Sequence, residues 1–154
     1  RRHKELREKL VDIAHTEYHR KAEEKWNIAY EHYVSKNYRM ALQELRKALE
    51  NKSTHIPSLM LFGEICFQKG QFKNAKNTYN ALRNLASSQQ NADVYETASM
   101  RLIDVELLVG NTVRAEQLTK SSIDRYKTLN KDKPYSIPLN KRRIRLEYLW
   151  RRRK

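Results

Sequence analysis

A chain of 154 residues is long enough for one folded domain, and its scarcity of glycine and proline, three of each, disfavours an all-β fold dense in turns. No apolar run approaches the length that a membrane span needs. The only cysteine, Cys66, cannot form an internal disulfide, which predicts an intracellular protein without specifying the compartment. A formal net charge of +14 favours acidic partners.

The first expected element is a helix over residues 1–21. Its apolar residues Leu6, Leu10, Ile13 and Tyr18 recur at helical spacing and therefore share one face. Two interpretations stay open, because this segment is either an N-terminal capping helix or the remnant of a preceding repeat. The chain begins with arginine rather than methionine, so we expect it to be part of a larger protein or assembly.

A pattern of small and aromatic residues then repeats along the chain. Ala41 has Tyr38 three residues before it, and Ala75, which follows Ala41 by 34 residues, has Phe72 in the same place. A weaker third copy is centred on Ala115, 40 residues after Ala75. Small residues at such positions allow two antiparallel helices to approach closely, so we expect the alanines to be buried.

With this spacing the sequence resembles the tetratricopeptide repeat family, whose unit of 34 residues has the same small and aromatic positions. The resemblance covers residues 22–127 and implies an all-α fold, a right-handed α-solenoid of antiparallel helix pairs with flanking N- and C-terminal helices. Three repeats would occupy residues 22–128. The expected helix pairs are 22–35 with 38–51, 57–69 with 72–86, and 93–109 with 112–128. Six extra residues before the third copy, 87–92, are polar and predict a surface loop.

The resemblance also implies a concave groove that the first helix of each pair lines, suited to an extended or helical partner segment. Large aromatic side chains with polar tips at these positions favour an amphipathic peptide. The alternative is that neighbouring helices cover several of them. The groove residues transferred from the family pattern are Trp26, Tyr30, Tyr33, Met60, Glu64, Phe67, Met100 and Asp104.

The end of the chain is strongly basic. Pro134 and Pro138 predict an extended connection over residues 129–138, and a basic C-terminal helix over 139–154 follows, with a net charge of +7. Such a segment either binds a polyanion, with RNA or DNA first among the candidates, or solvates the outer face of a capping helix. The candidate polyanion-binding residues are Lys141, Arg142, Arg143, Arg145, Arg151, Arg152, Arg153 and Lys154.

Catalytic motifs are not found in the sequence, which predicts no enzymatic activity, no catalytic residues and no cofactor. His15 and His19 lie one helical turn apart, but no further histidine or cysteine is near them in sequence, so we expect no metal site. The sequence therefore predicts a non-enzymatic scaffold for protein–protein interaction. An RNA- or DNA-associated module that uses the basic C-terminal helix is the alternative, and the oligomeric state stays open.

Overall fold

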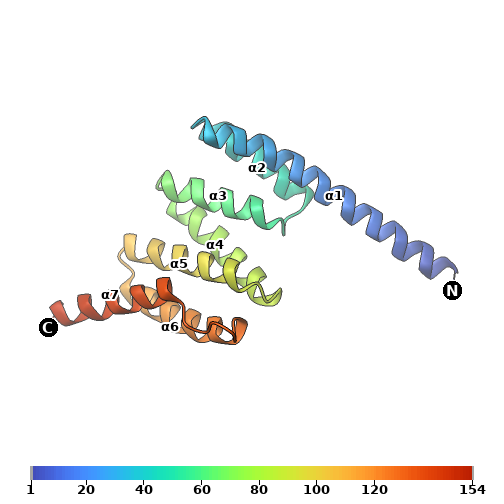
Figure 1. The fold of residues 1–154 in the computed structure, drawn as a ribbon. Helices are drawn as coiled ribbons and strands as arrows, with labels where there is room; N and C mark the ends of the chain where they lie inside the picture. The colour runs from blue at the N-terminus through green and yellow to red at the C-terminus, as the bar shows by residue number, and fades with distance from the viewer. Residues whose placement is uncertain (1, 154) are drawn as a thin grey trace. The chain divides into compact units, whose positions relative to one another are not determined.

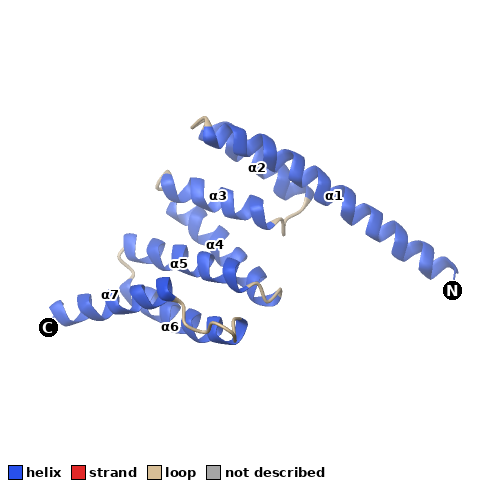
Figure 2. Ribbon diagram, viewed as in Figure 1, coloured by secondary structure: helices blue, strands red, loops and turns tan. Residues whose placement is uncertain are grey.

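The computed structural model describes residues 2–153 and the side chains of residues 2–152 (Figure 1). All regular structure in this part of the chain is α-helical, which confirms the predicted all-α class (Figure 2). The helices are α1 (Arg2–Val34), α2 (Tyr38–Asn51), α3 (Ile56–Gln68), α4 (Phe72–Ser88), α5 (Ala92–Leu108), α6 (Thr112–Leu129) and α7 (Ile137–Arg153). Of the predicted polyanion-binding residues, Lys154 and the side chain of Arg153 lie outside the described part.

The chain divides into two compact units, residues 1–65 and 66–154, here called the first and second unit. In the first unit α1 packs along α2. In the second unit α4 packs on α5, α5 on α6, and α7 on both α5 and α6. No helix among the described residues is long and apolar enough to cross a membrane.

The expected boundary at residue 21 lies inside α1, which continues without a break for 33 residues. An ion pair on the helix surface spans the boundary, because Arg20 contacts Glu24 one turn later, and Arg20 also contacts Glu17 one turn before it. The apolar face of Leu6, Leu10, Ile13 and Tyr18 is exposed. No described residue covers that face, and the choice between a capping helix and the remnant of a preceding repeat stays open.

The first predicted helix begins at residue 2 rather than at 22, and every other boundary of the predicted helix pairs lies within two residues of its expected position. Four helices end in one motif, in which a residue with positive φ precedes an N–H that donates to the carbonyl five residues before it. The positive φ values are 62° at Lys36, 74° at Gly70, 56° at Gln90 and 82° at Gly110. The N–H of Asn37, Gln71, Asn91 and Asn111 each lies 2.8 Å from its acceptor carbonyl.

The surface loop expected at residues 87–92 is shorter than predicted. Only residues 89–91 lie outside helices, between the end of α4 and the start of α5. The extra residues lengthen the helices instead, since α4 has 17 residues against 14 in α2, and α5 has 17 against 13 in α3. A helix extended by about one turn of 3.6 residues keeps its buried face in phase.

The extended connection is also shorter than predicted, because α7 begins at Ile137 and Pro138 lies in its first turn. Proline is tolerated there, since an N–H in the first turn has no partner within the helix. Ser136 begins the helix: its hydroxyl accepts a hydrogen bond from the Leu139 N–H at 3.3 Å, and its carbonyl accepts one from the Asn140 N–H at 3.0 Å. The non-helical connection is therefore residues 130–136.

The small residues of the repeat pattern are buried, as the sequence predicts. Ala29 and Ala41 are fully buried in the first unit, and Ala75 and Ala115 in the second. Large apolar side chains complete the core of the second unit. They include Tyr79, Leu82, Tyr95, Leu102, Ile103, Leu118, Leu139 and Leu146.

Candidate binding site

A surface pocket of about 440 Å³ in the second unit combines residues from both of the sites predicted from the sequence. It lies where the end of α3, the end of α5 and the first turns of α7 meet. Its apolar lining is Phe67, Leu107 and Leu108, and its polar lining is Asp104, Lys141, Arg142 and Arg145. Four predicted polar residues thus share one pocket with Phe67, although the groove and the basic helix were expected as separate sites.

A bidentate ion pair holds α7 against α5 at this pocket. Arg142 donates from Nε to Oδ1 of Asp104 and from Nη2 to Oδ2, each at 2.9 Å. The same guanidinium donates from Nη1 to the carbonyl of Pro138 at 3.0 Å. Asp104 and Arg142, predicted to face a partner, therefore bind each other and fix the geometry of the pocket.

The aromatic part of the lining is held by a second arginine. The guanidinium of Arg101 lies 4.8 Å from the centre of the Phe67 ring, and its Nη1 lies 4.0 Å from Oδ2 of Asp104. The Phe67 ring also contacts Phe72 edge-on, with 6.1 Å between ring centres. Asp104 thus lies between two guanidinium groups, and its negative charge is offset.

Two cations at the pocket remain available to a partner. Lys141 and Arg145 are exposed, and within the described residues neither makes an ion pair. Leu108, which shares the pocket with them, is 60% exposed. The apolar lining of the pocket lies beside two positive charges that no described residue neutralises. Such a pocket can bind a ligand that carries both an apolar group and an anionic group.

The first unit contains a separate surface of stacked aromatic rings. Trp26 and Tyr30 on α1 stack at 5.3 Å with 19° between their planes, and Tyr33 follows at 6.4 Å from Tyr30. Tyr38, which the sequence did not place in the groove, continues the row at 5.8 Å from Tyr33. The Trp26 indole donates to the carbonyl of Pro57 at 3.1 Å, whereas Tyr30 is 47% exposed.

The other predicted residues lie at less distinctive positions. Met60, Glu64 and Met100 are half-buried. Arg143 donates to Asn140 and to Glu147 on its own helix, at 3.1 Å and 2.9 Å, so its charge is used within α7. Arg151 and Arg152 are exposed.

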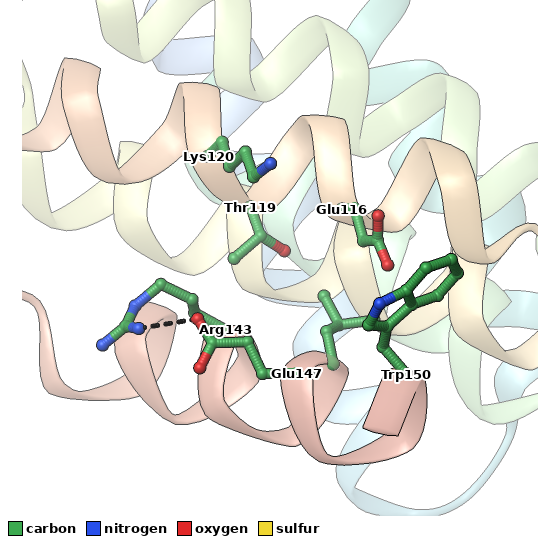
Figure 3. A pocket seen from close by; sticks show the side chains of 7 residues that line it. Glu116, Thr119, Lys120, Arg143, Glu147 and Trp150 are labelled. Atoms are coloured by element: carbon green, nitrogen blue, oxygen red, sulfur yellow. Dashed lines mark hydrogen bonds and ion pairs between the residues drawn. The ribbon is translucent and has the colours of Figure 1, made fainter. Parts of the chain in front are cut away.

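A second pocket, of about 290 Å³, lies between α6 and α7 (Figure 3). Trp150 closes one end, and the Arg143–Glu147 ion pair lies at the other. Glu116 and Lys120 on α6 add one charge of each sign. Because its charges balance, this pocket is less selective for an anion than the one beside Leu108. The apolar spacing of Leu146 and Trp150 is the sequence signal that points to this pocket.

Among the described residues, one group of side chains that could hold a metal lies in the first unit. This group contains His19, Glu23 and His55. His15, which the sequence analysis considered together with His19, is exposed and lies outside the group.

A scan against protein-family models found no match for this sequence, and a search of curated proteins found none either. The described residues thus form an all-α protein whose second unit has a basic, partly apolar surface pocket.

Proposed function

We propose that this chain is a non-enzymatic protein-interaction scaffold of the tetratricopeptide kind, a right-handed solenoid that binds a partner segment and belongs to a larger protein or assembly. The spacing of 34 residues between Ala41 and Ala75 supports the repeat assignment, as do the burial of both alanines and the helix boundaries around them. The third copy supports the assignment less strongly, because it follows the second by 40 residues and α4 and α5 are longer than α2 and α3.

We further propose that the second unit binds a segment bearing both carboxylates and apolar side chains. One observation carries this proposal: exposed Leu108 shares a pocket with Lys141 and Arg145, which have no ion-pair partner among the described residues. An apolar side chain of the partner would bury Leu108, and its carboxylates would pair with the two cations. Charge attraction would speed association, and apolar contact would slow dissociation.

Fluorescence anisotropy tests this proposal with two labelled probes. One is a helical peptide with leucine and glutamate on the same face, and the other is a single-stranded RNA of similar net charge. Leu108→Ser removes the apolar contact, and Lys141→Glu with Arg145→Glu reverses the charge of the pocket. Val113→Ser, at an exposed position on α6, is the matched control for Leu108→Ser. Arg151→Glu with Arg152→Glu is the matched control for the charge reversal.

The expected result is that the peptide binds and that both pocket variants weaken it about tenfold or more, equivalent to at least about 1.4 kcal/mol. The two control variants should bind the peptide nearly as well as the parent chain. If Leu108→Ser has no effect while every charge reversal weakens binding equally, the pocket is not the peptide site.

Binding of RNA or DNA is the second candidate. Arg151 and Arg152 are exposed, and the Arg152 guanidinium lies 5.9 Å from the centre of the exposed Tyr148 ring, so cations and an aromatic face occur together on α7. That combination suits a polyanion with stacking bases. In the same experiment, RNA binding that falls steeply with salt, depends on Arg151 and Arg152, and ignores Leu108 would favour this candidate.

A further inference from the structure

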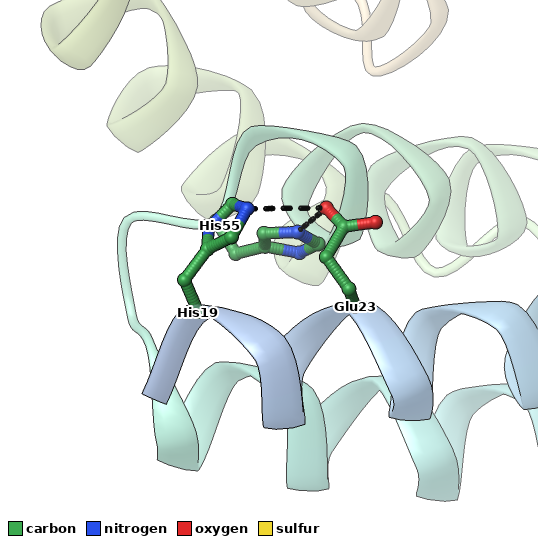
Figure 4. A group of neighbouring side chains, drawn as sticks. All are labelled: His19, Glu23 and His55. Atoms are coloured by element: carbon green, nitrogen blue, oxygen red, sulfur yellow. Dashed lines mark hydrogen bonds and ion pairs between the residues drawn. The ribbon is translucent and has the colours of Figure 1, made fainter. Parts of the chain in front are cut away.

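Three metal-ligating side chains converge in the first unit (Figure 4). His19 and Glu23 lie one turn apart on α1, and His55 immediately precedes α3. One ligand atom from each side chain lies within 4.8 Å of the other two. Figure 4 shows that all three side chains point toward one another, so the arrangement forms a small cluster rather than a row along the helix.

The turn between α2 and α3 places His55 against α1. The His55 N–H donates to the carbonyl of Lys52 at 3.1 Å, and the His55 carbonyl accepts from the Leu59 N–H at 3.0 Å, so His55 begins α3. Its side chain is buried, with only 1% exposed. These backbone hydrogen bonds therefore fix the position of His55 at the start of α3.

The second nitrogen of His55 has a partner that orients the ring. Nδ1 lies 2.6 Å from the hydroxyl of Ser58, while Nε2 lies 2.5 Å from Oε1 of Glu23. When Nδ1 carries the proton and donates to Ser58, Nε2 presents its lone pair toward Glu23 and His19. Ligating histidines are commonly held by such a hydrogen bond at the other nitrogen, which fixes the tautomer and the ring orientation.

Two imidazoles and one carboxylate are a donor set that zinc sites use when they keep a fourth position for water. Bonds of about 2.1 Å in a tetrahedron place neighbouring ligand atoms about 3.4 Å apart. Here Oε1 of Glu23 lies 3.8 Å from Nε2 of His19 and 2.5 Å from Nε2 of His55, on either side of that value. Side-chain movements of about an ångström would bring the three atoms to ligating positions.

The site has an entry path, because the side chains of His19 and Glu23 are 50% and 42% exposed. Lys52 competes with a metal ion for His19, since the Nζ of Lys52 lies 3.1 Å from Nδ1 of His19. An ammonium that donates to Nδ1 leaves the proton of the neutral ring on Nε2. Metal binding through Nε2 therefore requires Lys52 to move away, which a half-buried side chain on the surface can do.

We propose that His19, Glu23 and His55 bind one Zn²⁺ ion, or a divalent transition metal of similar preference, and that the ion ties α1 to the start of α3. Each ligand must be deprotonated, and water completes the coordination. The ion would replace the hydrogen bond between His55 and Glu23 and the 3.8 Å contact between His19 and Glu23. Its binding free energy would add to the stability of the first unit.

Isothermal titration of the chelator-treated full chain with ZnCl₂ tests the proposal, with Co²⁺ absorption as a report on tetrahedral nitrogen and oxygen coordination. The variants are His19→Ala and Glu23→Gln, both at partly exposed positions that leave the core intact. His15→Ala, one turn away on the same helix, is the matched control. Circular dichroism before titration verifies that each variant is folded.

The expected result is one Zn²⁺ per chain, a visible Co²⁺ spectrum of tetrahedral type, and unchanged binding in His15→Ala. Loss of a direct ligand should weaken binding by about 100-fold or more, beyond the 10- to 100-fold cost of losing a supporting partner. The proposal is overturned if the parent chain binds no Zn²⁺, if His19→Ala and Glu23→Gln bind as tightly as the parent, or if His15→Ala loses equally much.

Discussion

Arg142 on α7 and Asp104 on α5 form a bidentate ion pair, with Nε to Oδ1 and Nη2 to Oδ2 both at 2.9 Å, although 38 residues separate them. Their side chains are only 21% and 23% exposed. The pair lies at the pocket that also contains Lys141 and Arg145. It therefore links the position of the basic helix to the geometry of the proposed binding site.

Replacing Arg142 with lysine should loosen α7, because an ammonium lacks the planar fork of donors that fits both Asp104 oxygens and also reaches the Pro138 carbonyl. We expect a loss of about 1.5 kcal/mol in stability, the scale of a hydrogen bond to a charged group, and faster amide exchange along α7. Thermal denaturation and hydrogen exchange would measure the two effects. Arg143→Lys, which affects a pair within α7, should change both much less; equal effects would contradict the special position of Arg142.

The helix ends offer a test of backbone strain. Lys36 and Gly70 occupy corresponding turns with φ of 62° and 74°, a region that is unfavourable for lysine. Lys36→Gly should stabilise the protein by about 0.5 to 1 kcal/mol, and Gly70→Ala should destabilise it by about 1 kcal/mol. A Cβ at Gly70 would meet no atom within 4 Å, so the loss would come from the backbone alone. Chemical denaturation would measure the change in the free energy of unfolding for both variants. Stabilisation by Gly70→Ala would contradict the strain argument.

Glu106 on α5 is fully buried, and Nζ of Lys76 on α4 lies 2.8 Å from its Oε1. Removing the cation would leave a buried carboxylate without its partner, so Lys76→Met should cost about 2 kcal/mol or more. The double variant Lys76→Met with Glu106→Leu should recover most of that loss. Urea denaturation of the two variants gives the comparison.

The control for this ion pair is Lys73→Met, at an exposed position on the same helix. It should change stability by less than about 0.5 kcal/mol. A Lys76→Met variant as stable as this control would show that the buried carboxylate does not depend on Lys76.

Lys52→Ala should strengthen Zn²⁺ binding at the proposed metal site, because the ammonium beside Nδ1 of His19 opposes both the bound cation and the ligating tautomer. We expect a severalfold gain in affinity by calorimetry. Lys47→Ala, on the same unit but paired with Glu44, serves as the control for the loss of one positive charge. Equal gains in both variants would indicate general electrostatics rather than a contact with His19.

The order and ends of the helices could be read from local signals in the sequence. Buried alanines recur at a fixed place in each helix pair, and Gly70 and Gly110 mark turns that need positive φ. The same reasoning predicted too long a connection at residues 87–92 and at Pro138. Polar residues there can extend a helix as readily as form a loop, and proline fits a first helical turn.

The sequence by itself determined the all-α class, most of the helix boundaries and the burial of the small repeat residues, because periodicity and turn chemistry act over a few residues. Only the tertiary structure decided that Arg142 pairs with Asp104 and that His55 meets Glu23, which is 32 residues earlier in the chain. The chain has 32 lysines and arginines, so composition cannot single out the partner of one carboxylate. That choice depends on which helix faces pack together, and long-range packing fixes it.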